Sequence, residues 1–216
     1  MIVGNTIILN DENEIDARLA QMFEVRRDDL LAIVWSAVGA RNDAVSDDPI
    51  NAGGQFAYIF GTRGTRGLFR SKGWQIDRTD NIESVINPDT GVRVIYQNTD
   101  TAARATVSPK AVSGKGSAAE RMVEQQTYLF PDMERERLET LELDKKRENA
   151  TVWFLCVAVD ETGVWAEISR PRAIENNQFG EWIERIFLIE GGDADAPHFA
   201  SNDAEEQDYE IAVSRK

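Results

Sequence analysis

The sequence predicts an α+β protein in which N-terminal helices precede two antiparallel β-meanders, forming one globule or two lobes. Between residues 11 and 40, apolar side chains recur at helical spacing, which is typical of amphipathic or buried helices. Between residues 74 and 96, apolar and polar side chains alternate, as expected of strands with one buried face. Residues 152–159 are apolar at consecutive positions, which indicates a strand that is buried on both faces. A chain of 216 residues is long enough for one or two hydrophobic cores.

The chain is predicted to begin with a short strand and a helix. Residues 2–9 are apolar and rich in β-branched side chains, which favours a strand. Asp11 and Glu14 have the three-residue spacing of a helix N-terminal capping box. The apolar side chains of the following helix then lie on one stripe, formed by Ile15, Leu19, Met22 and Phe23.

Two further helices are expected before residue 75. The second begins near Asp28 or Asp29, and its apolar side chains cover more than one face, so we expect it to be buried. Residues 42–51 form a polar loop. The third helix starts after Gly53 and Gly54, and we expect three of its side chains to pack inward: Phe56, Ile59 and Phe60.

The remaining periodic segments predict the two meanders. Strands at residues 74–77, 83–86 and 92–96 form the first, with a turn at Pro88-Asp89-Thr90-Gly91. The second meander is expected from three segments, residues 152–159, 164–168 and 182–189.

The predicted organisation has four parts. Residues 1–100 hold the helices and the first meander, and residues 101–122 are a basic loop or linker. Residues 123–190 hold the second meander, and residues 191–216 are an acidic, partly mobile segment. Within that last part, residues 211–213 could return as an edge strand.

Composition excludes several classes of protein. The formal net charge is −14 and 42 % of residues are hydrophobic, which argues against wholesale disorder and against a simple basic nucleic-acid coat protein. The longest nearly apolar stretch, residues 30–40, is too short for a bilayer, which needs about 20 residues. Because no secretory signal is evident at the N-terminus, we expect a cytoplasmic protein without a membrane partner. Cys156 and His198 are the only residues of their kinds, so we expect no intrachain disulfide, no resident metal and no cofactor.

Positive charge is confined to two short glycine-containing segments. Residues 61–75 carry a net charge of +4 and residues 101–122 carry +3, which leaves −21 on the rest of the chain. A local site for an anion can persist inside a negative overall field when its charges are clustered. The two segments are therefore the candidate sites for a phosphate group or a nucleic acid.

The first basic segment contains Gly-Thr-Arg twice in tandem. If it is helical, Arg63, Arg66 and Arg70 share one face. If it is a loop, its glycines allow backbone N–H groups to converge on an anion. Either arrangement suits phosphate, because a guanidinium can donate to two oxygen atoms at once. Lys72 lies two residues after Arg70. Aromatic residues lie among and beside these cations: Tyr58, Phe60, Phe69 and Trp74. Interleaved basic and aromatic side chains can bind single-stranded nucleic acid by stacking, although rings at helical spacing are more typical of a core.

The second basic segment carries four cations, Arg104, Lys110, Lys115 and Arg121. It does not match a nucleotide-binding P-loop, because Gly116 follows Lys115 and no glycine stands five positions before Gly114. A flexible basic loop that closes over a phosphate, or a plain surface linker, remains the expectation.

A third pattern lies between Pro131 and Lys146. Pro131-Asp132, eleven residues and then Asp144-Lys145-Lys146 resembles the letters of the PD-(D/E)xK nuclease pattern. This resemblance implies that Asp132 and Asp144 would bind a metal ion and that Lys146 would assist the attacking water. The segment is dense in Glu and Arg, so an ion-paired helical face is the ordinary alternative.

These signals favour a non-enzymatic binding or accessory protein, with an acidic surface that faces another protein and basic segments that contact nucleic acid or phosphate. Two alternatives stay open. One is an acidic mimic of nucleic acid that inhibits a nucleic-acid enzyme, as some phage or mobile-element proteins do, using carboxylates such as Glu134, Glu136, Glu139 and Glu142. The other is the metal-dependent nuclease. The sequence does not indicate the oligomeric state.

Overall fold

A computed structural model describes residues 6–125 and 151–191, and its central element is a mixed sheet of seven strands. The strand order is β1-β9-β6-β5-β4-β3-β2. The strands are β1 (Ile7–Leu9), β2 (Gln75–Asp77), β3 (Ser84–Ile86), β4 (Val92–Asn98), β5 (Thr151–Asp160), β6 (Gly163–Pro171) and β9 (Trp182–Glu190). With four α-helices in the described part of the chain, this confirms the α+β class.

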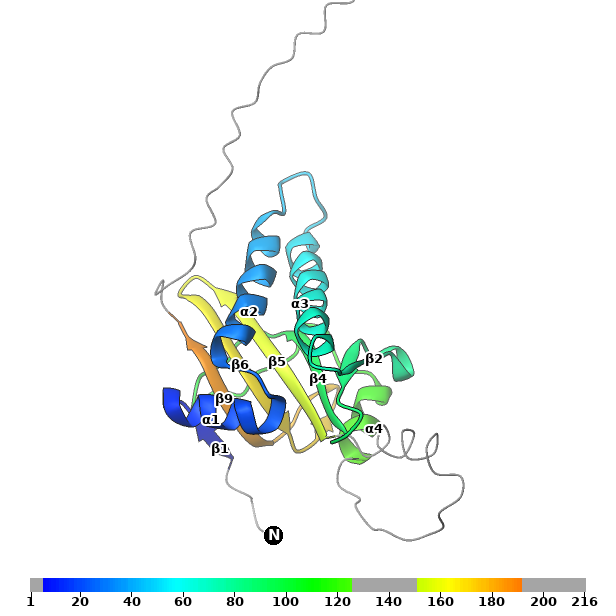
Figure 1. The fold of residues 1–216 in the computed structure, drawn as a ribbon. Coiled ribbons are helices and arrows are strands. Elements are labelled where there is room, and N and C mark those ends of the chain that lie inside the picture. The colour runs from blue at the N-terminus through cyan, green and yellow to red at the C-terminus, as the bar shows by residue number, and fades with distance from the viewer. Residues whose placement is uncertain (1–5, 126–150, 192–216) are drawn as a thin grey trace, which may run out of the picture.

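Three helices cover one face of this sheet. They are α1 (Glu12–Phe23), α2 (Arg27–Asn42) and α3 (Ala52–Arg70), and Figure 1 shows them in front of the strands. The Asp11 carboxylate accepts hydrogen bonds from the backbone N–H groups of Asn13, at 3.0 Å, and of Glu14, at 3.2 Å. These contacts satisfy two of the free donors at the start of α1, which explains why the helix begins there.

The sheet does not separate into two antiparallel units as the sequence suggested. The antiparallel runs β2-β3-β4 and β5-β6-β9 are joined by the parallel pair β4 and β5, in register from Val92 with Thr151 to Asn98 with Val157. A second parallel pair joins β1 to β9. Both pairings connect segments far apart in the chain, so no local periodicity signals them. The strand β5 is central and buried on both faces, as its continuous apolar pattern predicted.

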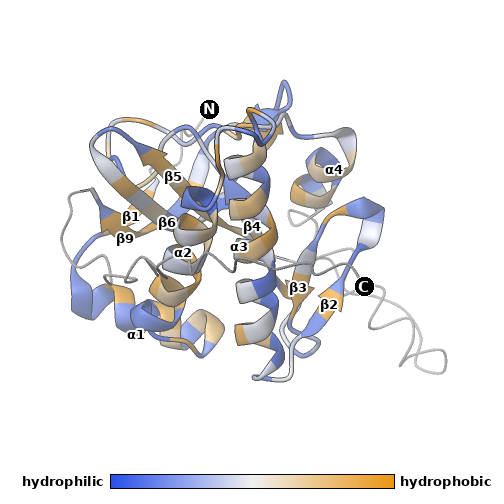
Figure 2. Cartoon of the chain, turned by 90° about the horizontal axis from the view of Figure 1, so that it is seen from above, coloured by the Kyte–Doolittle hydropathy of each residue, from blue (hydrophilic) through white to orange (hydrophobic). Residues whose placement is uncertain are grey.

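The opposite face of the sheet has a different cover. Residues 99–116, helix α4 (Ser117–Gln125) and the hairpin formed by β7 (Ile174–Glu175) and β8 (Gln178–Phe179) lie over it. Figure 2 shows α4 well apart from α2 and α3. Because neighbouring residues of a strand point to opposite faces, Trp153 joins the core under α1–α3 whereas Phe154 joins the second core.

The face of α3 that packs against the core is not the face that carries its large apolar side chains, which the sequence had predicted to point inward. Its buried positions include Ala57, Gly61, Thr65 and Phe69. By contrast, Ile59 is 47 % exposed and Phe60 is 37 % exposed, while Phe56 is only partly buried, so the expectation that all three pack inward was wrong.

The reason is the close approach of α3 to the sheet. A Cβ atom at Gly61 would overlap the ring of Tyr96 on β4, so only glycine allows this spacing of backbone and ring. The small side chains therefore select the inward face, and the bulky ones are left at the surface. Figure 2 shows hydrophobic and hydrophilic positions side by side along α3.

Several expectations fall on residues outside the described ranges. These include the mobile acidic segment, the possible edge strand at 211–213 and the nuclease-like pattern between residues 131 and 146. Within the described ranges, no helix is long and apolar enough to cross a membrane. The fourfold division of the chain stays a prediction.

Candidate functional site

The first basic segment forms the last part of α3 and the turn that follows it. Arg63, Arg66 and Arg70 line one side of a surface groove of about 520 Å³. The groove also runs past the exposed ring of Tyr58 and reaches β2 and the carboxylate of Glu83. The helical alternative for this segment is therefore correct, and it places the three guanidinium groups along one face.

The three arginines differ in how far their charge is already compensated. Arg66 forms an ion pair with Glu83, and Arg78 approaches the same carboxylate at 3.3 Å, so one negative group lies between two positive ones. Burial, followed by repulsion from Arg78, lowers the pKa of Arg66, although a guanidinium stays charged under all ordinary conditions. Arg63 lies over the ring of Phe60, at 4.6 Å from its centroid.

Arg63 and Arg70 are exposed, and within the described part of the chain neither has a carboxylate at ion-pair distance. Lys72 is exposed on the turn beyond α3, which ends with Gly73 at a φ of 86°. A solvated cation without a partner keeps its affinity for an incoming anion, whereas a paired one must first release its own carboxylate. The free positive charge of this face therefore comes chiefly from Arg63, Arg70 and Lys72.

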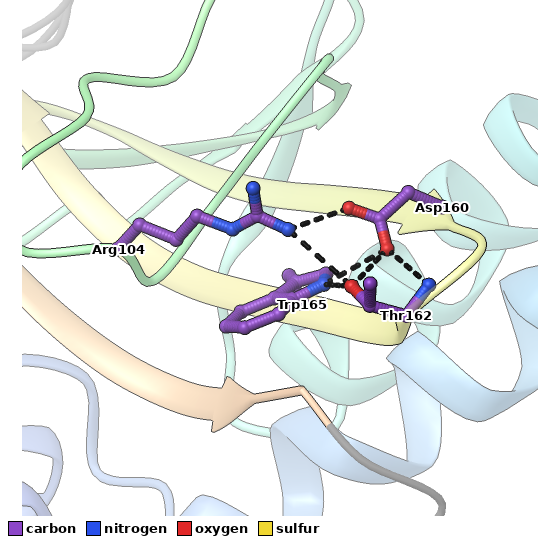
Figure 3. A network of polar contacts seen from close by, with 4 residues as sticks. All are labelled: Arg104, Asp160, Thr162 and Trp165. Atoms are coloured by element: carbon purple, nitrogen blue, oxygen red, sulfur yellow. Dashed lines mark hydrogen bonds and ion pairs between the residues drawn. The ribbon is translucent and has the colours of Figure 1, made fainter.

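The second basic segment is not assembled into one surface. Arg104 pairs with Asp160 at 2.6 Å and lies over the ring of Trp165, as Figure 3 shows. Arg121, on α4, approaches Asp80 at 3.5 Å, and Lys110 is exposed. Of these four cations, only Lys115 lines a cavity that α3 also lines.

Lys115 lines a cavity of about 590 Å³ beside the groove. The cavity and the groove share Tyr58 and Ile59 of α3 together with Glu83, so one basic segment borders the other at this point. Most of the cavity wall is apolar, contributed by residues that include Ile59, Ile82, Ile95, Met122 and Phe154. A pocket of this size and composition is typical of a small-molecule site.

The ammonium group of Lys115 is held between aromatic rings. It lies 4.8 Å from the ring centroid of Phe154 and 5.0 Å from that of Phe179, and it donates a hydrogen bond to Oε1 of Gln97. Burial lowers the pKa of Lys115 to about 8, and the electrostatic effect of Cys156 opposes this shift. At pH 7 the group is therefore still largely protonated, although its charge is poorly solvated.

The loop that carries Lys115 is fixed to the β7–β8 hairpin. The backbone N–H of Lys115 donates to the carbonyl oxygen of Asn177 at 2.7 Å, and Gly114 packs near the same residue. Asn176 and Asn177 form the hairpin turn with φ values of 51° and 63°, a conformation that asparagine tolerates better than most residues. The hairpin thus positions a side chain that the sequence alone assigned to a surface loop.

The described residues offer little for metal or thiol chemistry. None of their His, Cys, Asp and Glu side chains form a group of three that could hold a metal ion. Cys156 is buried in β5, and burial raises the pKa of its thiol, which keeps it protonated and unreactive. The nuclease candidates Asp132, Asp144 and Lys146 lie outside the described residues, as does His198.

Comparisons of this chain with protein-family models, with curated proteins and with solved structures found no match. The case for a function therefore rests on the α3 face and the cavity. Sequence reasoning identified the arginines of the groove, but it missed the residues that build the cavity around Lys115, such as Gln97 and Phe154. These come from strands β4 and β5, and their alternation with core residues was the only signal that they face the opposite side of the sheet.

Proposed function

We propose that this chain is a non-enzymatic binding protein that contacts the phosphates of a nucleic acid through the outer face of α3. The observation that carries the proposal is the alignment of Arg63, Arg66 and Arg70 along one groove, with Arg63 and Arg70 exposed. The rise of an α-helix is about 1.5 Å per residue, so the first and last of these residues lie about 10 Å apart along its axis. Such a row suits successive phosphates of one strand.

The exposed aromatic ring of Tyr58 supports a single strand as the ligand. This ring lies in the wall of the same groove and is 39 % exposed. An unpaired base can stack on an aromatic ring while its phosphates contact nearby cations, whereas a base in a duplex has no free face. The acidic remainder of the surface is then available for a protein partner, as the charge pattern suggested.

The overall charge of −14 does not exclude this contact. At an ionic strength of 0.1 M the Debye length is about 10 Å, so distant carboxylates are screened and the nearest charges dominate. Among the described residues that line the groove, the one carboxylate is that of Glu83, which is already engaged by Arg66 and Arg78.

The test is binding of a labelled single-stranded oligonucleotide, measured by fluorescence anisotropy at several salt concentrations. The variant Arg63→Gln/Arg70→Gln removes the two arginines that have no carboxylate partner among the described residues and leaves the Arg66–Glu83 pair in place. Each lost phosphate contact should reduce the slope of log K against log salt by about 0.7, so the double variant should lose about 1.4.

The matched control is Arg41→Gln/Arg172→Gln, which removes the same charge from exposed positions on other parts of the molecule. It should leave both affinity and slope nearly unchanged. Absence of binding by the unaltered protein at low salt, or an equal loss in the two double variants, would refute a specific role for α3.

A further inference from the structure

The cavity beside α3 combines an apolar interior with a polar margin. Ile82 and Ile95 belong to its apolar wall, whereas Asn51, Gln55 and Asn81 contribute amides. A ligand that fills such a space must carry an apolar body, because each buried polar group without a hydrogen bond would weaken binding.

The charge of Lys115 is not neutralised within the described part of the chain. No carboxylate there lies at ion-pair distance from its ammonium group. Glu83 is the one acidic residue of the described cavity wall, and it is occupied by Arg66 and Arg78. The two aromatic rings offer weak electrostatic attraction, which replaces only part of the lost hydration.

Among the described residues, the hydrogen-bonding capacity of this ammonium group is also incompletely used. Lys115 has three N–H donors, and Gln97 accepts from one of them. The amide of Gln97 is held in this orientation because its Nε2 donates to the backbone oxygen of Asn98 at 2.8 Å. The protein therefore presents a positioned cation with donors to spare inside a largely apolar cavity.

We propose that this cavity is a binding site for a small organic acid, whose apolar body fills the space bounded by α3, β4 and residues 112–122 and whose acidic group pairs with Lys115. A carboxylate would supply the missing negative charge and would accept the remaining donors in surroundings where such a contact is strong. This site adjoins the proposed contact with nucleic acid at Tyr58, Ile59 and Glu83, but the acidic group is held by Lys115, which takes no part in the arginine row.

The test compares acids with uncharged molecules of nearly the same shape. Two pairs of probes are used, benzoate with benzamide and 1-naphthaleneacetate with 1-naphthaleneacetamide, and binding is measured by calorimetry at pH 7. In at least one pair the acid should bind about tenfold more tightly than the amide, as expected for one hydrogen-bonded contact between charged groups.

Two variants then assign this preference to Lys115. Lys115→Met should abolish it, because the charge is removed while an apolar chain of similar length remains. Gln97→Glu should also abolish it, because a carboxylate of the protein would then occupy the ammonium group. Lys110→Met is the matched control, since that lysine is exposed in the same segment, and it should change nothing.

The proposal is overturned if neither pair binds, if acid and amide bind equally in both pairs, or if the preference survives in Lys115→Met or in Gln97→Glu. The second variant keeps the test valid should Lys115→Met fail to fold. Failure of this proposal is distinguishable from failure of the proposed function, because Arg63→Gln/Arg70→Gln should retain the preference for the acid.

Discussion

The two faces of the sheet are both buried, but by different kinds of residue. Under α1–α3 the core consists of apolar side chains such as Phe23, Leu30 and Trp153. The opposite face also has an apolar core, but buried charges lie within it. Arg185 pairs with Glu167 at 2.6 Å, and Arg93 pairs with Asp77 at 2.7 Å, with all four side chains almost fully buried.

The difference follows from what covers each face. A helix satisfies most of its own backbone hydrogen bonds, so an apolar surface is enough to hold it. Residues 99–116 have little regular structure, and their backbone groups need other partners. Glu167 accepts a hydrogen bond from the N–H of Ala103, and Arg185 donates to the carbonyl oxygen of Arg104 at 3.1 Å. The buried Glu167–Arg185 pair thus holds this irregular segment on the sheet.

The largest loss of stability is expected when one charge of the buried Glu167–Arg185 pair is removed. Arg185→Met would leave the fully buried carboxylate of Glu167 without its cation and the carbonyl of Arg104 without its donor. We expect a loss of about 3–5 kcal/mol in the free energy of unfolding, measured by urea denaturation. Arg172→Met, which breaks the exposed pair with Glu181, should cost about 1 kcal/mol or less. Equal losses would contradict a special role for the buried pair.

On the face covered by α1–α3, stability depends on the short distance between α3 and the sheet and not on a buried charge. Gly61→Ala would drive a methyl group into the ring of Tyr96 and push α3 away from the sheet, which should cost about 1–3 kcal/mol. Gly67→Ala is the matched control on the same helix, because a Cβ there has open space around it. It should stabilise the protein by up to about 1 kcal/mol through helix propensity. Thermal unfolding of the two variants should therefore shift in opposite directions.

This comparison also explains what the sequence could and could not predict. The start of α1 and the central position of β5 follow from local spacing and capping, and these predictions were confirmed. For the arginine segment the sequence left a helix and a loop open, and the structure shows the helix. The inward face of α3 was not predictable from hydrophobicity, because Gly61 is selected by the ring of Tyr96 from another element.

The candidate site was predictable to a similar, limited extent. The row of arginines follows from helical spacing alone. The surroundings of Lys115 do not, because they depend on the parallel pairing of β4 with β5 and on a hairpin more than fifty residues further along the chain. Long-range pairing of this kind leaves no periodic signal near the residue that it positions.

An intermediate effect is expected when pH is raised, because the preference of the Lys115 cavity for an acid should then fall. With a pKa of about 8, Lys115 is mostly charged at pH 7 and mostly neutral at pH 9. The preference for 1-naphthaleneacetate over its amide should therefore fall about tenfold between these pH values, which corresponds to about 1.4 kcal/mol. The other titratable groups around the cavity are Tyr58, Glu83, Tyr96 and Cys156.

Two of these neighbours should not interfere, because burial raises the pKa values of Tyr96 and Cys156 and so keeps both neutral over this range. Calorimetry in buffers of different ionisation enthalpy gives a second measurement, since binding of the acid near pH 8 should take up a proton. A preference that stays constant from pH 7 to pH 9 would show that Lys115 does not supply the charge.

The smallest loss of stability is expected from a substitution at the solvent-exposed part of residues 99–116. The side chain of Arg104 pairs with Asp160, as drawn in Figure 3. Its guanidinium carbon lies 4.2 Å from the ring centroid of Trp165. Both members of the ion pair are about one-third exposed, so Arg104→Gln should cost about 1 kcal/mol or less. The low pKa of Asp160 should largely persist, because its main cause is the hydrogen bond from the Thr162 hydroxyl.

Arg104→Gln and Arg185→Met thus test the same attachment at its exposed and its buried end. The backbone carbonyl of residue 104 remains available to Arg185 in the first variant, so the amide of Ala103 should stay protected from hydrogen exchange. In the second variant that protection should fall together with global stability. If Arg104→Gln destabilises the protein as much as Arg185→Met does, the exposed network and not the buried pair holds residues 99–116 on the sheet.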